Sequence, residues 1–165
     1  MLYNNYAIFG LSKTGKTTFI NKNFCSKFDN KHKFAVDFKQ QLDVKNRVHS
    51  VEKLFIDIAP KVKNSLFIVD DATGILNAGN SEVNDKILFL LNTARHDNNF
   101  YIFVYHSVNY YPLRFTPGIH CFLFFNIGDN INLIDKRLQV FDKKELLKIC
   151  KPKKIGVFNA IYKNS

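Results

Sequence analysis

Short apolar runs and amphipathic segments alternate along the chain. Strands are predicted at 6–10, 33–38, 65–71, 100–106, 121–126 and 154–162. Apolar residues at helical spacing, or helix-favouring sequence, predict helices over 16–24, 48–62, 81–96, 130–141 and 142–150. Most strand segments are apolar almost throughout, as is typical of strands covered on both faces of a parallel sheet. The alternation therefore predicts an α/β domain with a mostly parallel central sheet and helices on both faces.

Length and composition add limits to this picture. The 165 residues suit one domain over 1–165, and 46% of them are apolar, enough for a real core. The longest apolar run is strand-sized, so no membrane segment is expected. Three cysteines without C-x-x-C spacing indicate free thiols in a reducing cytosol, and hence a cytoplasmic protein. The net charge of +10 favours a polyanion partner, but a lysine-rich soluble surface explains it equally well.

The segment GLSKTGKT at 10–17 fits the pattern G-x-x-x-x-G-K-[ST] at every fixed position, between a predicted strand and a predicted helix. In this Walker A loop the glycines let backbone N–H groups wrap around phosphate oxygens. Lys16 is expected to reach the β- and γ-phosphates of ATP, and Thr17 to ligate Mg²⁺. The predicted nucleotide-binding residues are Gly10, Ser12, Lys13, Thr14, Gly15, Lys16, Thr17 and Thr18, with Thr18 also supporting the start of the helix.

An acidic pair, Asp70 and Asp71, ends the third predicted strand. The carboxyl ends of parallel strands face the ligand in such folds, so Asp70 suits the Walker B role at Mg²⁺. Asp71 is a candidate general base for the attacking water, although DDATG at 70–74 also has the composition of an ordinary turn. The D-x-x-G match at 71–74 does not indicate a GTPase, because the chain has no N-K-x-D signature.

Four segments in order, GLSKTGKTT, LFIVDDA, TARHDNNFYIFVYHS and FFNIGDNINLIDKRL, resemble the FtsK–HerA superfamily of P-loop ATPases. That superfamily includes DNA-pumping motors and viral genome-packaging ATPases, and the resemblance covers residues 5–162. It implies a RecA-like P-loop NTPase fold and ATP hydrolysis with Mg²⁺. It also implies a homo-oligomeric ring (pentamer or hexamer), double-stranded DNA as partner, and association with a capsid portal or vertex of a virion.

The resemblance also implies roles for three residues beyond the Walker motifs. Arg95, at the end of the helix 81–96, resembles the arginine that completes a neighbouring subunit's site; alternatively it complements the helix dipole. His106 and Ser107, at the tip of the strand 100–106, resemble the sensor of the γ-phosphate, and the sequence does not choose between them. The pair is His-Ser where the family often has Gln, and the acidic pair is Asp-Asp where it usually has Asp-Glu.

The leading hypothesis is thus a DNA-translocating, genome-packaging ATPase. Basic loop residues such as Lys39 and Arg114 are candidate DNA-facing groups, although ordinary loop composition accounts for them equally well, so neither is predicted as a site. The alternative is a small nucleotide or metabolite kinase, since a Walker A loop does not separate kinases from ATPases. A third hypothesis is an ATP-binding assembly protein that has lost hydrolysis.

Overall fold

The computed structural model describes residues 3–72, 81–127 and 158–162, and the statements below refer to these. Seven strands form one sheet in the order β3-β2-β4-β5-β1-β6-β7. The strands are β1 (Asn5–Phe9), β2 (Lys33–Val36), β3 (Asn46–Arg47), β4 (Leu66–Val69), β5 (Phe100–Tyr105), β6 (Cys121–Phe124) and β7 (Asn159–Tyr162). All neighbouring pairs are parallel except β6 and β7, which are antiparallel. The prediction of a mostly parallel sheet is confirmed.

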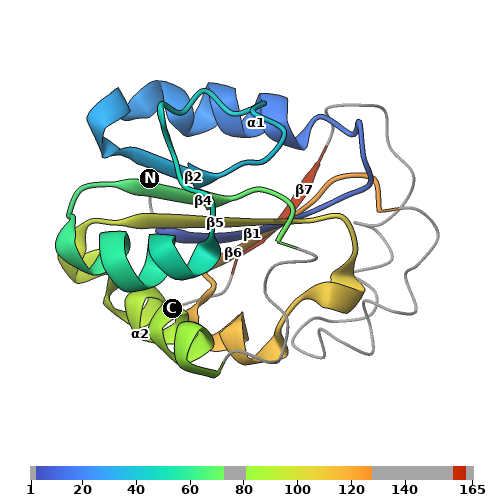
Figure 1. Cartoon of the computed structure of the whole chain (residues 1–165). Helices are drawn as coiled ribbons and strands as arrows, with labels where there is room; N and C mark the ends of the chain where they lie inside the picture. The colour runs from blue at the N-terminus through green and yellow to red at the C-terminus, as the bar shows by residue number, and fades with distance from the viewer. Residues whose placement is uncertain (1–2, 73–80, 128–157, 163–165) are drawn as a thin grey trace.

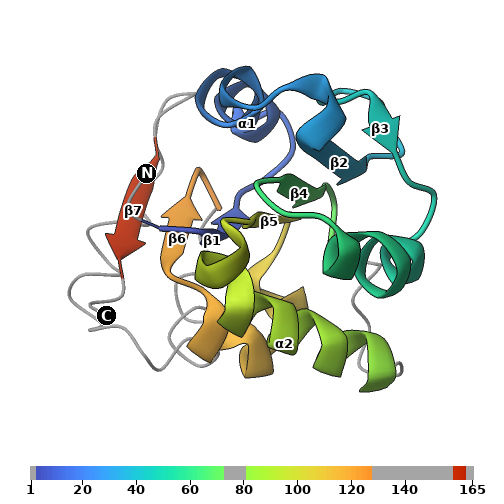
Figure 2. The ribbon, with the colours of Figure 1, turned by 90° about the vertical axis from the view of Figure 1, so that its left-hand side faces the viewer.

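Helices cover both faces of this sheet, as predicted. Figures 1 and 2 show α1 (Lys16–Asn23) on one face, and α2 (Ser81–Asp97) with the π-helix η3 (Lys53–Ile58) on the other. Short 3₁₀ helices make up the remaining described helical segments: η1 (Cys25–Lys27), η2 (Asn30–His32), η4 (Ala59–Lys61), η5 (Val108–Tyr110) and η6 (Leu113–Gly118). The fold thus consists of three layers with the sheet in the middle.

Alternation along the strands divides the core into two apolar clusters, one on each face of the sheet. In β1, Tyr6 and Ile8 pack in the cluster that includes Ile20 of α1. Ala7 and Phe9 pack in the cluster that includes residues of α2 and η3. Successive strand side chains point to opposite faces, so both sides of β1 are buried. The apolar composition that predicted this strand therefore reflects burial on both faces.

The strand order places three chain segments at one edge of the sheet. β5 lies between β1 and β4, with Phe9 paired to Tyr105 and Val69 paired to Phe103. The residues that follow these parallel strands consequently meet at their carboxyl ends, where ligands bind in open α/β sheets. They are the Walker A loop after β1, the acidic pair after β4 and the His-Ser pair after β5.

The predicted helix over 48–62 is only partly right. Val48 is not helical, and its N–H donates to the Ala35 carbonyl at 2.8 Å, which prolongs the contact between β3 and β2. The helical segment that follows is a π-helix and then a 3₁₀ helix containing Pro60, rather than a regular α-helix. Hydrophobic spacing alone does not distinguish α-, 3₁₀ and π-helices, because a 3₁₀ or a π turn closes only one residue earlier or later than an α turn.

Other strand and helix bounds agree with the prediction to within a few residues. The strand predicted at 65–71 ends at Val69, because Asp71 turns away with a left-handed φ of 58°. The predicted helices 130–141 and 142–150, and the start of the strand predicted at 154–162, lie outside the described residues. Cys25 and Cys121 are buried free thiols, and Cys150 is outside the described part. None of the described helices combines the length and apolarity that crossing a membrane requires.

Candidate nucleotide-binding site

The Walker A loop leaves the sheet between two neighbouring strands. The Gly10 N–H donates to the Tyr105 carbonyl at 3.1 Å, and the Leu11 N–H donates to the Asn126 carbonyl at 2.8 Å. A Cβ added to Gly10 would lie 2.7 Å from the Phe125 Cβ, closer than two non-bonded carbon atoms normally approach. The first glycine of the motif is therefore required for close packing against the segment after β6.

The second glycine permits the turn into α1. Gly15 has a φ of 96°, and Lys13 also takes a left-handed φ of 63°. The Thr14 hydroxyl donates to the Leu11 carbonyl at 2.8 Å and closes the loop. α1 then begins at Lys16, and the first N–H groups of a helix have no partner within the helix. The loop and helix start therefore offer backbone donors to an anion.

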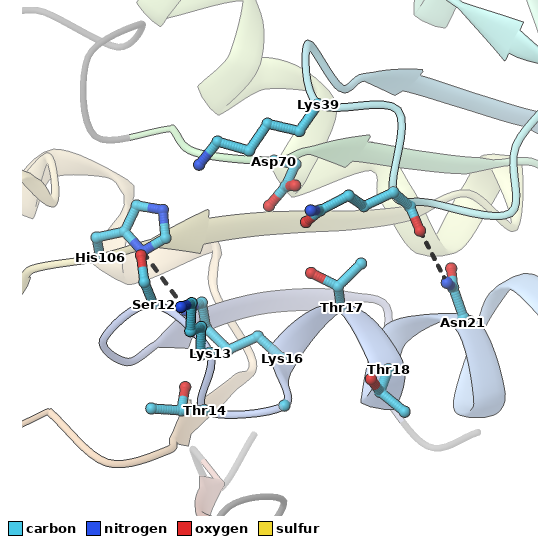
Figure 3. A pocket seen from close by; sticks show the side chains of 12 residues that line it. Ser12, Lys13, Thr14, Lys16, Thr17, Thr18, Asn21, Lys39, Asp70 and His106 are labelled. Carbon is cyan, nitrogen blue, oxygen red and sulfur yellow. Dashed lines mark hydrogen bonds between the residues drawn. The ribbon is translucent and has the colours of Figure 1, made fainter.

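A pocket of about 580 Å³ lies against this loop. Figure 3 shows the side chains that surround it. Its lining residues are Ser12, Lys13, Thr14, Gly15, Lys16, Thr17, Thr18, Asn21, Lys39, Gln41, Asp70 and His106. Three lysines against one carboxylate give the pocket a positive balance, which favours a polyanionic ligand such as a nucleotide polyphosphate.

Lys16 is folded back onto its own loop. Its Nζ donates to the carbonyls of Gly10 and Leu11, both at 2.7 Å, and lies 3.5 Å from His106 Nδ1. Burial lowers the pKa of Lys16 from 10.5 to about 8, although Asp70 and Asp71 act in the opposite direction. The ammonium group is thus held by neutral carbonyl groups. Charged phosphate oxygens of a bound nucleotide would form stronger hydrogen bonds with it.

Asp70 and Thr17 supply oxygen ligands of the kind that Mg²⁺ prefers. Both line the pocket, and Figure 3 shows the Asp70 carboxylate on the β4 side and the Thr17 hydroxyl on the α1 side. Burial raises the pKa of Asp70, and nearby Asp37 raises it further, while Lys16 and His106 lower it. A bound cation would favour the charged carboxylate, so these residues fit the predicted metal role.

The described residues contain no group of three or more His, Cys, Asp or Glu side chains that could hold a metal ion. Mg²⁺ bound with a nucleotide commonly takes one or two carboxylates from the protein, and phosphates and waters for the rest. A site of Thr17 and Asp70, completed by phosphates and waters, would be of this nucleotide-linked kind.

His106 connects the pocket to Asp71. The ring nitrogen Nδ1 faces the Lys16 ammonium at 3.5 Å, and Nε2 lies 3.5 Å from Asp71 Oδ2. An ammonium group only donates, so Nδ1 accepts and the tautomer that fits carries its proton on Nε2, directed at the carboxylate. Asp71 Oδ2 also lies 3.9 Å from Lys39 Nζ. Lys16, His106, Asp71 and Lys39 consequently form one chain of polar contacts along the edge of the sheet.

Strand alternation separates the two residues at the tip of β5. Ile102 and Val104 pack in the cluster on the α1 face, so His106 points to that same face, where it lines the pocket. Ser107 does not line it; the Ser107 Oγ accepts from the Asn109 N–H at 3.3 Å and caps η5. Of the two predicted sensor residues, the structure brings His106 to the phosphate loop. The alternation in β4 likewise places Asp70 in the pocket and leaves Asp71 outside the lining.

Arg95 is remote from the pocket of its own chain. It is exposed near the end of α2. This end of the helix lies beside the start of β5, since the N–H of Asn99, the residue before β5, donates to the Ala94 carbonyl. The pocket lies beyond the other end of β5, which at about 3.3 Å per residue places it on the order of 20 Å away along the strand direction. Arg95 therefore cannot reach a nucleotide in this pocket, and its predicted role concerns a neighbouring subunit.

Four residues at or beside the pocket were not predicted as site residues: Asn21, Asp37, Lys39 and Gln41. Asn21 lies on α1 just past the Walker motif, and the other three lie after β2. Asp37 at the carboxyl end of a predicted strand was the available signal, because such positions face the ligand in parallel sheets. That β2 lies beside β4 was not available from the sequence.

Solved structures provide the comparison with known proteins, because no protein-family model and no curated protein sequence matches the chain. The genome-packaging NTPase of Sulfolobus turreted icosahedral virus 2, in complex with ATP-γ-S, is 14% identical with a TM-score of 0.70. That similarity covers 97% of this chain and 92% of the viral protein.

Two bacterial structures are similar over a smaller part of the chain. The cytoplasmic domain of the type VII secretion ATPase EccC from Thermomonospora curvata is 16% identical with a TM-score of 0.57, covering 75% of this chain and 19% of that solved chain. The N-terminal domain of zonular occludens toxin from Neisseria meningitidis is 14% identical with a TM-score of 0.53, covering 75% and 77%. These similarities confirm the predicted resemblance at the level of the fold: the chain has a RecA-like P-loop NTPase fold, which it shares with these three structures.

Proposed function

We propose that this chain is a single ATPase domain that hydrolyses ATP and moves double-stranded DNA, as the packaging motor of a virus. The observation that carries the proposal is the convergence of Lys16, Thr17, Asp70 and His106 on one positively charged pocket. The similarity to a viral genome-packaging NTPase over 97% of this chain supports it. The net charge of +10 suits a nucleic-acid partner.

In this proposal the Walker A residues 10–18 hold the phosphates through backbone N–H groups, and Lys16 moves from the carbonyls of Gly10 and Leu11 to the β- and γ-phosphates. Thr17 and Asp70 would hold Mg²⁺, which supplies charge neutralisation at the β- and γ-phosphate oxygens when bound. The half-buried Asp70 carboxylate is then balanced by the cation rather than by Lys16 alone.

The His106–Asp71 pair suggests how the attacking water is activated. When Lys16 turns to the phosphates, Nδ1 of His106 becomes available to accept a proton from a water molecule at the γ-phosphate. Asp71, 3.5 Å from Nε2, holds the ring orientation and stabilises the imidazolium that forms. Asp71 thus acts through His106, and His106 is at the same time the residue that senses the γ-phosphate. Ser107 contributes by fixing the turn that follows β5.

The remote position of Arg95 favours a homo-oligomeric ring, a pentamer or hexamer, in which each Arg95 completes the pocket of its neighbour. A guanidinium supplied in this way stabilises charge on the transferred phosphoryl group only in the assembled ring. The ring is proposed to act at a capsid portal or vertex, and therefore to occur both in the cytoplasm and on the assembling virion.

ATP turnover measured at low salt, with and without linear double-stranded DNA, tests the proposal. We expect turnover in both conditions, an increase on adding DNA, and loss of activity in Lys16→Ala. The mass of the protein with and without a non-hydrolysable nucleotide should show a ring. Turnover that DNA leaves unchanged, from a protein that stays monomeric, would overturn the motor assignment.

The DNA-stimulation experiment, together with a substrate screen, distinguishes the motor from the kinase alternative. Small-molecule kinases of this fold commonly close arginines over the phosphates, whereas the described residues that line the pocket include no arginine. Phosphate transfer to a nucleotide or metabolite acceptor in a substrate screen, without stimulation by DNA, would favour a kinase. Binding of ATP with no turnover under any condition would instead favour an assembly protein.

A further inference from the structure

The loop after β2, residues 37–43, forms a wall of the pocket that the Walker motifs do not account for. We refer to it as the β2 loop. Lys39 and Gln41 from this loop line the pocket together with Asp70 and the Walker A residues. Because β2 lies beside β4, the β2 loop adjoins the acidic pair rather than the first half of the Walker A loop.

Hydrogen bonds at both ends hold the β2 loop in place. At its start, the buried Asp37 Oδ2 accepts from the Leu42 N–H at 2.8 Å and lies 3.8 Å from Arg47 Nε. On the other side, Asn21 of α1 donates to the Gln41 carbonyl at 3.1 Å and accepts from the Asp43 N–H at 2.8 Å. The helix that carries Lys16 and Thr17 therefore also positions the β2 loop.

Lys39 extends from this loop past Asp70 towards His106 (Figure 3). Its side chain is 55% exposed, and its nearest carboxylate partner is Asp71, with Nζ 3.9 Å from Oδ2. An exposed pair at this distance contributes little stability, so the ammonium group is readily available to a ligand. Its place beside Asp70 is the end of the pocket where the terminal phosphate and its Mg²⁺ are expected.

We infer that Lys39 contacts the terminal phosphate of the bound nucleotide from the same subunit, and makes the pocket selective for a triphosphate over a diphosphate. Asn21 and Asp37 are positioning residues for this contact. The inference rests on the proposed function, because it takes the pocket to be an ATP site. It reassigns Lys39, a candidate DNA-facing residue by sequence, to the nucleotide pocket.

The test compares the affinities of two nucleotides for the unmodified chain and four variants. The probes are ADP and the non-hydrolysable analogue AMPPCP, each with Mg²⁺, titrated into the whole chain without DNA. Lys39→Ala should weaken AMPPCP binding by about tenfold or more, the scale of a charge-assisted hydrogen bond, and ADP binding by less than about twofold. Lys39→Arg should restore most of the lost affinity.

Lys45→Ala is the matched control, since Lys45 is an exposed lysine just beyond the β2 loop that does not line the pocket. It should leave both affinities unchanged. Asn21→Ala removes no charge, yet should lower the affinity for AMPPCP more than that for ADP, because the β2 loop loses two of its hydrogen bonds. Thermal unfolding without nucleotide shows whether each variant is folded.

Equal losses for ADP and AMPPCP in Lys39→Ala, or no loss for either, would overturn the inference. So would an equal effect of Lys45→Ala, which would indicate general electrostatic attraction instead. Failure of the premise that the pocket is an ATP site looks different: the unmodified chain would bind neither nucleotide, and Lys16→Ala would change nothing. Failure of the motor function alone would leave both affinities in place and appear only as turnover that DNA does not stimulate.

Discussion

Burial of a charged lysine at the phosphate loop should lower the stability of the nucleotide-free protein. Lys16 is 5% exposed, and its pKa is lowered from 10.5 to about 8. At about 1.4 kcal/mol for each pH unit, this difference corresponds to about 3 kcal/mol of destabilisation while the lysine is charged. Replacing Lys16 with Met keeps the length of the side chain and removes the charge.

The gain in the free energy of unfolding expected for Lys16→Met is smaller than about 3 kcal/mol. The substitution also removes two hydrogen bonds of 2.7 Å to the carbonyls of Gly10 and Leu11. Each such bond contributes about 1 kcal/mol. We therefore expect Lys16→Met to unfold at a higher urea concentration than the unmodified chain at pH 7, with a gain of about 1 to 2 kcal/mol. The same variant should have lost nucleotide binding.

The dependence on pH identifies the cause. Since the pKa of Lys16 is lower in the folded than in the unfolded chain, the unfolded chain binds more protons between about pH 8 and 10.5. The destabilisation is therefore complete below pH 8 and is lost as the pH rises through that window. By pH 10 the free energy of unfolding of the unmodified chain should have risen by about 2 kcal/mol relative to that of Lys16→Met. The variant should then no longer be the more stable of the two.

Lys22→Met is the matched control, because Lys22 is an exposed lysine on the same helix. It should change stability little at either pH. A Lys16→Met protein that is less stable than the unmodified chain at pH 7 would refute the reasoning. A stability difference that stays constant between pH 7 and pH 10 would refute it as well.

Three further predictions concern the loop, the core and the subunit contact. Gly10→Ala should abolish nucleotide binding and lower the free energy of unfolding by about 1 to 3 kcal/mol, measured in urea, because the new Cβ would lie 2.7 Å from the Phe125 Cβ. Unaltered nucleotide binding would contradict this packing. Asn5→Asp should cost more than about 2 kcal/mol by the same measurement, since the buried Asn5 amide donates to the carbonyls of Leu91 and Gly118; a change below 0.5 kcal/mol would show these bonds unimportant. Arg95→Ala should bind ATP normally but not hydrolyse it, and mixing it with Lys16→Ala should restore some turnover; a fully active Arg95→Ala would exclude the role in trans.

The elements that the sequence predicted well are those whose burial is the same on both faces. β1, β4, β5 and β6 are apolar almost throughout because α1 covers one face of the sheet and α2 and η3 the other. The Walker A loop was also predictable, since its backbone path requires glycine at Gly10 and Gly15. In these segments local composition directly reports the three-dimensional environment.

The choice between His106 and Ser107 illustrates what local composition leaves open. Both follow the same apolar strand, and alternation says only that they point to opposite faces. Which face holds the phosphate loop depends on the position of α1, a property of the whole fold. Once Ile102 and Val104 are known to pack against the α1 side, His106 is the residue in the pocket.

The β2 loop was missed for a related reason. Lys39 and Gln41 belong to a polar segment without periodicity, and such segments are ordinary loops in most proteins. Their approach to Asp70 depends on β2 pairing with β4, a contact between segments about thirty residues apart. Sequence patterns predict strands more readily than strand order, so a residue whose role depends on strand order escapes detection.

Displacement of a third strand from a DNA triplex measures the central claim most directly, because a motor that moves along a duplex strips the strand bound in its groove. The labelled third strand on a linear duplex should be released by the unmodified chain with ATP and Mg²⁺. It should stay bound with ADP, with AMPPCP, or with Lys16→Ala and ATP. Release at the same rate in all of these conditions, or steady ATP hydrolysis without release, would contradict the account of this chain as a DNA-translocating ATPase.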